Sequence, residues 1–175
     1  SGETLRAYDT QQGNAPVVIK RPALQDAPPI RAGQEVSILN EKRALEALSG
    51  HPVLAELRHS GVFRVGGQQH HYIVIEMATG ETLESILLNL AAQGKRLPDL
   101  EMLNILDGLL DLLQAAHDRA IIYNDVDAKH LFWDREQYLL KLIDWGNAVF
   151  LDTPHSGAHV SRQTDIQQVG QLIYF

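Results

Sequence analysis

A glutamate lies within an apolar helical pattern near the start of the sequence. Glu41 follows Ile38 by three residues and precedes Leu45 by four, so the three side chains share one face of a helix. A carboxylate on an apolar face is costly to bury unless a cation pairs with it. Lys20 ends the short β-branched run 15–20 and is the candidate partner. A lysine held in this way can contact phosphate oxygens. The alternative is that Glu41 lies at the edge of the face and reaches water.

A dense polar cluster follows in the second half of the sequence. Two carboxylates, a lysine and a histidine lie within six residues, at Asp125, Asp127, Lys129 and His130. The apolar segment 131–133 comes directly after them. A carboxylate held among such neighbours can act as the general base for a hydroxyl group. The alternative is a solvated turn, which would not need hydrophobic residues beside it.

A third acidic residue, Asp144, ends an apolar run and is followed by Trp145 and Gly146. A carboxylate in this place is suited to ligate a divalent metal ion. Asp-x-Gly turns are common, so the pattern alone is weak evidence for a metal site. Its position fourteen residues after the polar cluster strengthens it. His155 and His159 have the four-residue spacing of a zinc-binding helix, but a neighbouring proline and glycine disfavour a helix there.

The elements expected to position these side chains change from strands to helices along the chain. The first half is predicted to contain strands over 15–20, 63–65 and 71–77, the last two joined by a hairpin turn at Gly66-Gly67. A loop marked by Pro22, Pro28, Pro29 and Gly33 is predicted before a helix over about 34–48. The second half is predicted to contain helices over 81–92, from 98 onward and from 164 onward, with short strands over 121–123 and 139–143. An ordinary core helix is expected from 98 onward, with an apolar stripe that Ile105, Leu109 and Leu112 widen. The members of the stripe are Leu100, Leu103, Leu106, Leu110 and Leu113. Strands followed by helices indicate an α+β fold with two lobes.

Composition excludes several classes of protein. The 175 residues include 22 acidic and 15 basic side chains, a formal net charge of −7, and no cysteine. The absence of cysteine rules out a disulfide framework, an iron–sulfur cluster and a thiolate zinc site. The acidic balance argues against a nucleic-acid partner. No apolar run approaches the roughly 20 residues of a membrane-spanning helix, so we expect a cytoplasmic protein without a membrane segment in this chain.

The side chains Lys20, Glu41, Asp125 and Asp144 occur in an order that points to a family. The chain resembles a eukaryotic-like (Hanks-type) serine/threonine protein kinase domain, and its motif sequences are similar to those of the bacterial members. The segments that carry the resemblance are Gly2–Asp9 for the second half of the glycine-rich loop, Val17–Lys20 for the V-A-I-K strand, Asn40–Leu45 for the kinase helix C, Tyr72–Met77 for the strand before the hinge, Tyr123–Asp125 for H-R-D, Asp144–Gly146 for D-F-G and Thr164–Gly170 for the start of the kinase helix F.

The resemblance implies a two-lobed fold, with a small β-rich N-lobe over 1–78 and a helical C-lobe over 79–175. The fold is expected to be truncated at both ends, because the sequence begins within the glycine-rich loop and ends within the kinase helix F. ATP and Mg²⁺ are the implied cofactors, and a nucleotide and a protein substrate are the implied partners. The implied ATP-binding residues are Gly2, Thr4, Val18, Lys20, Glu41, Ile75, Glu76, Ala78 and Phe132. The implied catalytic residues are Asp125, Lys129 and Lys20, and the implied metal ligands are Asp144 and, as further candidates, His130 and Asp127.

Several positions depart from the family pattern. His130 stands in place of the metal-binding asparagine, although Mg²⁺ prefers oxygen ligands and imidazole suits softer metals. Asp127 stands where serine/threonine kinases have a phosphate-neutralising lysine, and Lys129 matches the place of an arginine in receptor tyrosine kinases. Tyr123 replaces the structural histidine of H-R-D, and the segment 146–165 has no A-P-E motif.

The retained residues favour ATP-dependent transfer of the γ-phosphate to protein serine or threonine hydroxyls, with altered or weak activity. A pseudokinase that acts as a nucleotide-binding or scaffolding module is the first alternative, because of His130, Asp127 and the missing A-P-E motif. A small-molecule kinase of the aminoglycoside-phosphotransferase type is the second, because an Asp-Trp pair follows an apolar strand and the segment after it is short.

Overall fold

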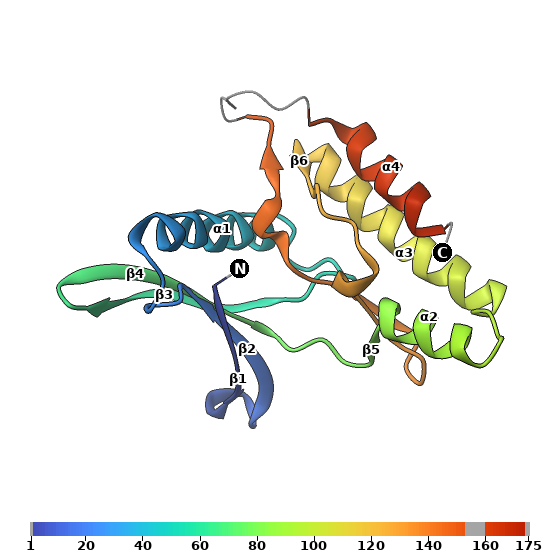
Figure 1. The fold of residues 1–175 in the computed structure, drawn as a ribbon, viewed down its shortest axis with the longest axis horizontal. Coiled ribbons are helices and arrows are strands. Elements are labelled where there is room, and N and C mark those ends of the chain that lie inside the picture. Colours follow the sequence, from blue (N-terminus) through green and yellow to red (C-terminus); the bar gives the residue numbers. More distant parts are fainter. Residues whose placement is uncertain (1, 153–159, 174–175) are drawn as a thin grey trace.

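The computed structural model describes residues 2–152 and 160–173, so the candidate zinc ligands His155 and His159 lie outside the described residues. An antiparallel sheet and one long helix form the first part of the described chain, and helices with short strands form the second (Figure 1). The predicted α+β fold with a β-rich lobe and a helical lobe is therefore confirmed. A membrane span would need a longer apolar helix than any found in these residues.

The N-terminal sheet has four strands in the order β1-β2-β4-β3. They are β1 (Glu3–Asp9), β2 (Ala15–Arg21), β3 (Leu57–Val65) and β4 (Gln68–Glu76). The hairpin between β3 and β4 turns at Gly66 and Gly67, whose φ angles are 58° and 80°. A two-residue turn with two positive φ angles matches the twist of the strands, and glycine adopts it without steric cost. The predicted hairpin is thus present, with longer strands than the prediction gave.

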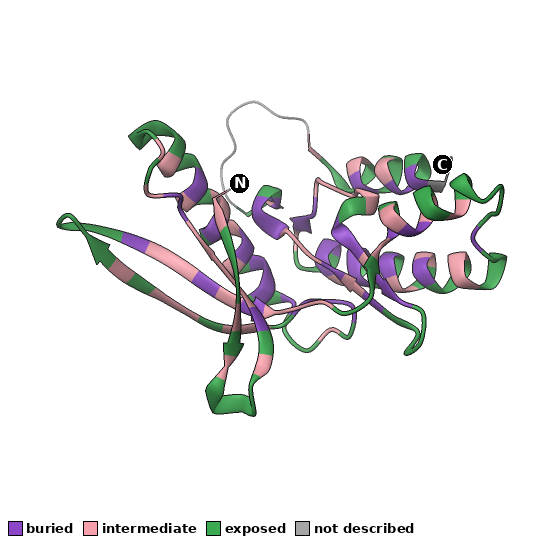
Figure 2. Ribbon diagram, turned by 60° about the horizontal axis from the view of Figure 1, so that its bottom comes forward, coloured by how far each residue is buried: buried purple, intermediate pink, exposed green. Residues whose placement is uncertain are grey.

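Helix α1 (Pro28–Ala47) packs on the sheet and carries Glu41. The predicted start near residue 34 was wrong by six residues, since Pro28 and Pro29 form the first turn rather than a loop. A proline fits the first turn of a helix because its missing N–H would have no partner there. The helix buries Ile38, Glu41, Ala44 and Leu45. Figure 2 shows this buried side of α1, in purple, facing the sheet.

The second part of the chain packs helices around short strands. The helices are α2 (Leu83–Ala92), α3 (Asp99–Asp118) and α4 (Arg162–Ile173), and the strands are β5 (Glu81–Thr82), β6 (Ile121–Ile122), β7 (Leu131–Asp134), β8 (Leu139–Leu142) and β9 (Val149–Phe150). The connection between the two parts is short, since β4 ends at Glu76 and β5 begins at Glu81. The domain limits 1–78 and 79–175 stay predictions.

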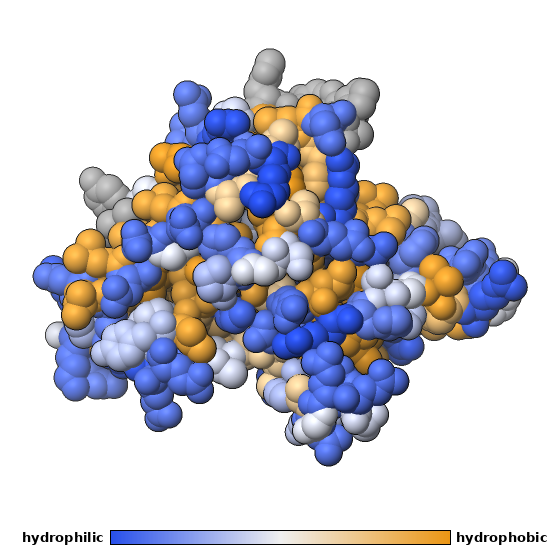
Figure 3. All heavy atoms as spheres, turned by 180° about the vertical axis from the view of Figure 1, so that it is seen from behind, coloured by the Kyte–Doolittle hydropathy of each residue, from blue (hydrophilic) through white to orange (hydrophobic). Residues whose placement is uncertain are grey.

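Only part of the predicted apolar face of α3 is buried. Leu113 of the stripe is buried together with Ile105, Leu109 and Leu112 beside it, whereas Leu100, Leu103 and Leu110 are 67%, 62% and 43% exposed. The buried face is therefore centred on the residues that widen the stripe, because apolar side chains spread around much of this helix. Apolar side chains also interrupt the polar surface at several places when the molecule is seen from behind (Figure 3).

Candidate functional site

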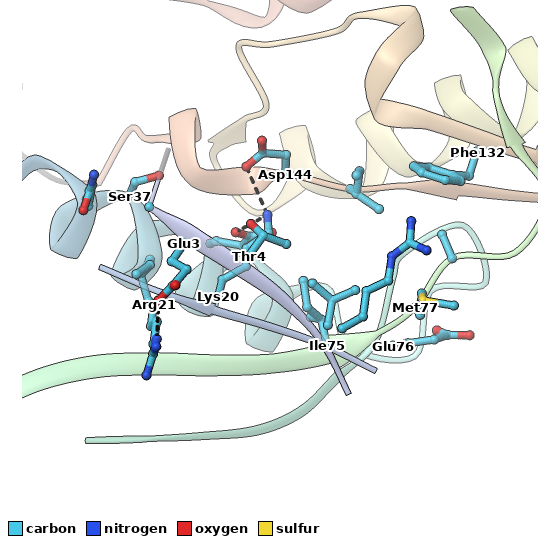
Figure 4. Close-up of a pocket in the computed structure, with 18 of the residues that line it drawn as sticks. Glu3, Thr4, Lys20, Arg21, Ser37, Ile75, Glu76, Met77, Phe132 and Asp144 are labelled. Atoms are coloured by element: carbon cyan, nitrogen blue, oxygen red, sulfur yellow. Dashed lines mark hydrogen bonds and ion pairs between the residues drawn. The ribbon is translucent and has the colours of Figure 1, made fainter. Parts of the chain in front are cut away.

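A cavity of about 450 Å³ lies against the inner face of the sheet, and every residue predicted to bind ATP lines it (Figure 4). The alternation of the strands explains this arrangement. Thr4 and Arg6 on β1 and Val18 and Lys20 on β2 recur every second residue, so they point to the same face of the sheet, and Gly2 directly precedes β1. Sequence reasoning missed Arg6, although the same alternation would have found it. It also missed the remaining lining residues, namely Glu3 and Arg21 at the ends of these two strands and Gln34, Ser37, Ile38, Met77, Gly80 and Ile143 from other parts of the chain.

Lys20 binds two carboxylates on the cavity wall. Its Nζ donates to both carboxylate oxygens of Glu41 at 2.8 Å and to Oδ1 of Asp144 at 3.2 Å. Figure 4 shows the Lys20 and Asp144 side chains pointing toward one another from opposite sides of the cavity. The Glu41 side chain is 3% exposed, so it does not reach water as the alternative required. The structure therefore brings together three residues that span 124 positions of the sequence, from Lys20 to Asp144.

The ionisation of this group follows from its burial and its charges. Burial lowers the pKa of Lys20, but the charges of Glu41 and Asp144 outweigh that effect and raise the pKa overall. Burial raises the pKa of Glu41, and the Lys20 ammonium opposes this rise. Lys20 consequently stays protonated near neutral pH. A fixed ammonium group at the inner end of an open cavity is a binding site for an anion such as a phosphate.

The turn after β8 directs Asp144 toward the cavity. Asp144 has φ 64°, a left-handed conformation that is unusual for a residue with a side chain. The next residues form a 3-10 turn, Trp145–Asn147, that packs on α1. Gly146 is needed there, because a Cβ at this position would collide with the Oγ of Ser37. The Asn40 side-chain amide also donates to the Gly146 carbonyl at 3.4 Å.

A buried carboxylate on α4 holds the loop that contains Asp125. Asp165 is fully buried and accepts hydrogen bonds from the backbone N–H groups of Tyr123 and Asn124, at 3.0 and 2.7 Å. The side chain of His117 on α3 also binds it at 2.8 Å. The sequence analysis singled out the segment of Asp165 but not these partners, which only the folded chain brings together. They fix the backbone immediately before Asp125.

Tyr123 connects this loop to the strand that ends at Asp144. Its hydroxyl donates to the Ile143 carbonyl at 2.6 Å, and its ring packs edge-to-face against Trp145 at 4.7 Å between centroids. Burial raises the pKa of Tyr123 well above its ordinary value, and the charges of Asp144 and Asp125 add to the effect. The phenol therefore stays protonated and can keep donating this hydrogen bond.

Asp125 itself lies near the surface, with 29% of its side chain exposed. The amide of Asn147 donates to its Oδ2 at 3.0 Å. Sequence reasoning missed Asn147, although its place directly after Asp144-Trp145-Gly146 was a signal that it lies in the same site. One carboxylate oxygen is thus oriented by Asn147, and the side chain is accessible to a substrate hydroxyl.

Lys129 and Asp127 bind each other. Lys129 Nζ donates to Asp127 Oδ2 at 2.8 Å, and its backbone N–H donates to Oδ1 at 3.1 Å. The hydrogen bond from Lys129 lowers the pKa of Asp127. Oδ2 of Asp127 thus accepts from the Lys129 ammonium and Oδ1 from a backbone N–H, so a metal ion would have to compete with Lys129 for Asp127, and the predicted role of Asp127 as a metal ligand stays a prediction. Half of the Lys129 side chain is exposed, so it can reach a ligand that approaches Asp125.

His130 is buried between Asp125 and Asp144. Its Nδ1 lies 3.1 Å from the Asp125 carbonyl oxygen, and its Nε2 lies 3.7 Å from Asp144 Oδ2. The described residues contain no group of three or more His, Cys, Asp or Glu side chains that could hold a metal ion by themselves. A divalent ion at Asp144 would therefore need ligands from a bound phosphate as well.

Comparison with known families agrees with this arrangement of charged groups. The model of the protein kinase domain matches residues 1–167. The chain belongs to the protein kinase family. This kinase domain is 33% identical over 90 residues to "Putative cyclin-dependent kinase F-2" of Oryza sativa subsp. japonica, covering 50% of this chain and 27% of the rice protein. It is 29% identical over 87 residues to "Probable serine/threonine-protein kinase fnkB" of Dictyostelium discoideum, covering 50% of this chain and 16% of that protein.

The family assignment confirms the predicted Hanks-type kinase domain. Both relatives are eukaryotic, so the resemblance to bacterial members stays a prediction. This kinase domain spans less than a third of the length of either relative. The roles of the individual site residues also stay predictions, and the geometry of those residues is the basis for the proposal that follows.

Proposed function

We propose that this kinase domain transfers the γ-phosphate of ATP to serine or threonine hydroxyls of a protein. The observation that carries the proposal is the position of Lys20, whose ammonium group binds Glu41 and Asp144 at the same time. The ammonium group of Lys20 is thus held in the cavity by two partners, Glu41 and Asp144. Phosphoryl transfer depends mainly on positioning and on stabilisation of charge, and this group supplies both.

The cavity accommodates a nucleotide in one orientation. Val18 and Ile75 offer apolar surface from the sheet and Phe132 offers it from β7, so a base would bind between them. The backbone groups of Glu76 and Ala78 line the edge of this region and are suited to hydrogen bonds with the base. The phosphates would then extend past Gly2 and Thr4 toward Lys20. This order follows from the wall, where Val18, Ile75 and Phe132 supply apolar surface at one end and Lys20 supplies an ammonium group at the other.

The transfer step uses Asp125 as the base. The acceptor hydroxyl oxygen forms a bond to the γ-phosphorus while the bond from this phosphorus to the β–γ bridging oxygen breaks. Asp125 takes the hydroxyl proton, and ADP leaves with the electrons of the broken bond. Asn147 holds Oδ2 of Asp125 at 3.0 Å and orients the carboxylate for this proton transfer. Lys129 lies beside the site and would stabilise charge on the transferred group.

The donor set near Asp144 fits a divalent cation, since a carboxylate oxygen faces the end of the cavity where the phosphates would lie. Asp144 and His130 would hold such an ion, which would neutralise phosphate charge. Asp127 hydrogen-bonds Lys129 with both of its oxygens and could ligate the ion only in competition with that pair.

Transfer of labelled γ-phosphate to the chain itself and to a generic protein substrate tests the proposal. We expect transfer by the wild type and a loss of roughly 10²–10⁴-fold in Asp125→Asn, the usual contribution of a general base. Asp107→Asn is the matched control, because Asp107 is exposed on α3. Equal transfer by the wild type and Asp125→Asn would refute the proposal. Transfer to an aminoglycoside with none to protein would instead support a small-molecule kinase.

A pseudokinase is the second candidate, and the observation that favours it is the imidazole of His130 next to Asp144. A pseudokinase would bind nucleotide and lack transfer. Thermal unfolding with ATP, with and without Mg²⁺, separates the two functions. Stabilisation that does not depend on the metal, together with no turnover, supports the pseudokinase. Metal-dependent stabilisation with turnover supports the active kinase.

A further inference from the structure

We propose that His130 and Asp144 together form a divalent-cation site that binds Mn²⁺ in preference to Mg²⁺. The inference rests on the proposed function in one respect, because the remaining ligands are oxygens of a bound nucleotide. It goes beyond that function by assigning the identity of the ion. The argument depends on the hydrogen bonding, the spacing and the burial of these two side chains.

The hydrogen bond at Nδ1 determines which nitrogen of His130 is available. The Asp125 carbonyl oxygen, 3.1 Å from Nδ1, can only accept, so Nδ1 carries the proton. In the neutral ring, Nε2 then holds a lone pair. A histidine whose Nδ1–H donates to a backbone carbonyl and whose Nε2 is free has the arrangement in which imidazole ligates metals.

The spacing of the two ligand atoms suits a shared ion. Nε2 of His130 and Oδ2 of Asp144 are 3.7 Å apart. Two ligand atoms that are each about 2.1 Å from one ion and about 90–120° apart are separated by roughly 3.0–3.6 Å, so a small movement brings both within bonding distance. Asp144 can ligate with Oδ2 without losing Lys20, because Lys20 binds the other oxygen, Oδ1.

The His130 ring is also held in place by its surroundings. Its side chain is 9% exposed, and the Ile143 backbone N–H donates to the His130 carbonyl at 3.0 Å. The ring is therefore fixed relative to the strand that ends at Asp144. A buried and oriented ring contributes a ligand with little loss of conformational freedom on binding.

The chemistry of this ligand pair distinguishes between ions. Mg²⁺ is a hard cation that prefers oxygen ligands in near-ideal octahedral geometry. First-row transition ions accept imidazole nitrogen more readily than Mg²⁺ does, and Mn²⁺ is among the ions that also suit carboxylate oxygens. Asp127 hydrogen-bonds Lys129 with both oxygens, so its use as a ligand in place of the imidazole would compete with that ion pair. One nitrogen among several oxygens therefore favours Mn²⁺ over Mg²⁺ at this site.

Pulsed electron paramagnetic resonance tests the ligand directly and needs no catalytic turnover. The sample is the wild-type chain with Mn²⁺ and a non-hydrolysable ATP analogue, and the variant is His130→Asn. We expect nitrogen-14 modulation from a directly bound imidazole in the wild type and its loss in His130→Asn. His59→Asn is the control, since His59 is an exposed histidine that binds Tyr72. Bound Mn²⁺ without this modulation in the wild type, or equal modulation in His130→Asn, overturns the proposal.

Ion competition tests the selectivity. The ratio of the Mg²⁺ and Mn²⁺ dissociation constants is measured on the nucleotide complex of the wild type and of His130→Asn. We expect the preference for Mn²⁺ to fall by about tenfold or more in His130→Asn. An unchanged ratio overturns the metal inference and leaves the kinase proposal intact. Nucleotide affinity is measured first without metal, and complete absence of nucleotide binding with either ion refutes both proposals.

Discussion

The carboxylate of Asp165 accepts the backbone N–H of Asn124 at 2.7 Å, across 41 positions of sequence. This hydrogen bond joins α4 to the loop that presents Asp125. Because Asp165 also binds the Tyr123 backbone and the His117 side chain, one buried group fixes three parts of the helical lobe. The position of the proposed base therefore depends on a residue that does not contact the cavity.

Replacing Asp165 by asparagine tests this dependence. Asp165→Asn leaves a single acceptor oxygen and turns an amide donor toward groups that themselves donate. We expect the free energy of unfolding to fall by about 2–4 kcal/mol, measured by urea denaturation. Asp118→Asn, at an exposed position at the end of α3, should change it by less than about 0.5 kcal/mol. Similar stabilities for the two variants would show that the buried hydrogen bonds are not needed.

The ion pair of Lys20 and Glu41 should matter more for the rate than for nucleotide affinity. Glu41→Gln keeps the size of the buried side chain but removes its charge and one of its two acceptor oxygens, so Asp144 remains the one ion-pair partner of Lys20 among the described residues. We expect kcat for phosphate transfer to fall about 10²-fold, because small displacements of a positioning group have effects of this size. Initial-rate kinetics at varied ATP separate kcat from KM. Glu46→Gln is the control on the same helix, and its side chain is 54% exposed. A kcat for Glu41→Gln within twofold of the wild type would contradict this role.

The hydrogen bond of Tyr123 makes a spectroscopic prediction. Because burial and neighbouring carboxylates raise the pKa of Tyr123 well above its ordinary value, this phenol should stay protonated at a pH above the ordinary pKa of tyrosine. Alkaline titration of phenolate absorbance should therefore give the same amplitude for the wild type and Tyr123→Phe below the unfolding transition. Loss of about one fifth of the amplitude in the variant, one of five tyrosines, would show that Tyr123 titrates normally.

The same variant tests how much the hydroxyl contributes to stability. Tyr123→Phe keeps the ring that packs on Trp145 but leaves the Ile143 carbonyl without its donor. We expect a loss of about 1–3 kcal/mol in the free energy of unfolding, the cost of an unsatisfied buried acceptor. A loss below about 0.5 kcal/mol would mean that water replaces the phenol.

The contact between Glu101 and Arg135 predicts a dependence of stability on pH. Arg135 donates to both Glu101 oxygens, at 2.8 and 2.7 Å, and this hydrogen bonding lowers the pKa of Glu101 below 4.5. The pair therefore stabilises the fold fully above about pH 4.5, and the contribution is lost as pH falls through the lower folded-state pKa. Glu101→Gln should be less stable than the wild type by about 0.5–1 kcal/mol near pH 6, and the gap should close on acidification. Urea denaturation near pH 6 and again in acid, below the folded-state pKa of Glu101, measures this difference in stability. Glu136→Gln is the exposed control. A gap that widens in acid would reverse the assigned sign.

Some of the site was predictable because local chemistry left few choices. A glutamate on an apolar helix face needs a cation, and Lys20 at the end of an apolar strand was available to supply it. The order of Lys20, Glu41, Asp125 and Asp144 then indicated the family. The contacts of Asp165 and Asn147 were not predictable in this way, because they join backbone and side-chain groups whose proximity depends on the whole fold.

The errors have an equally physical origin. The start of α1 was misplaced because proline was interpreted as a loop residue, whereas it is also favoured at the first position of a helix. The face of α3 was only partly predicted, because the hydrophobic period does not determine which part of a wide apolar face is buried. Packing against the rest of the chain decides this, and it buries Leu109 and Leu112 while leaving Leu100 and Leu103 exposed.

The close approach of Gly146 to Ser37 links the turn after Asp144 to helix α1. A side chain at position 146 would collide with the Oγ of Ser37, and the Asn40 amide donates to the Gly146 carbonyl across the same junction. Helix α1 carries Glu41 and the turn carries Asp144. We therefore expect that a displacement of either element alters both carboxylate contacts of Lys20 together.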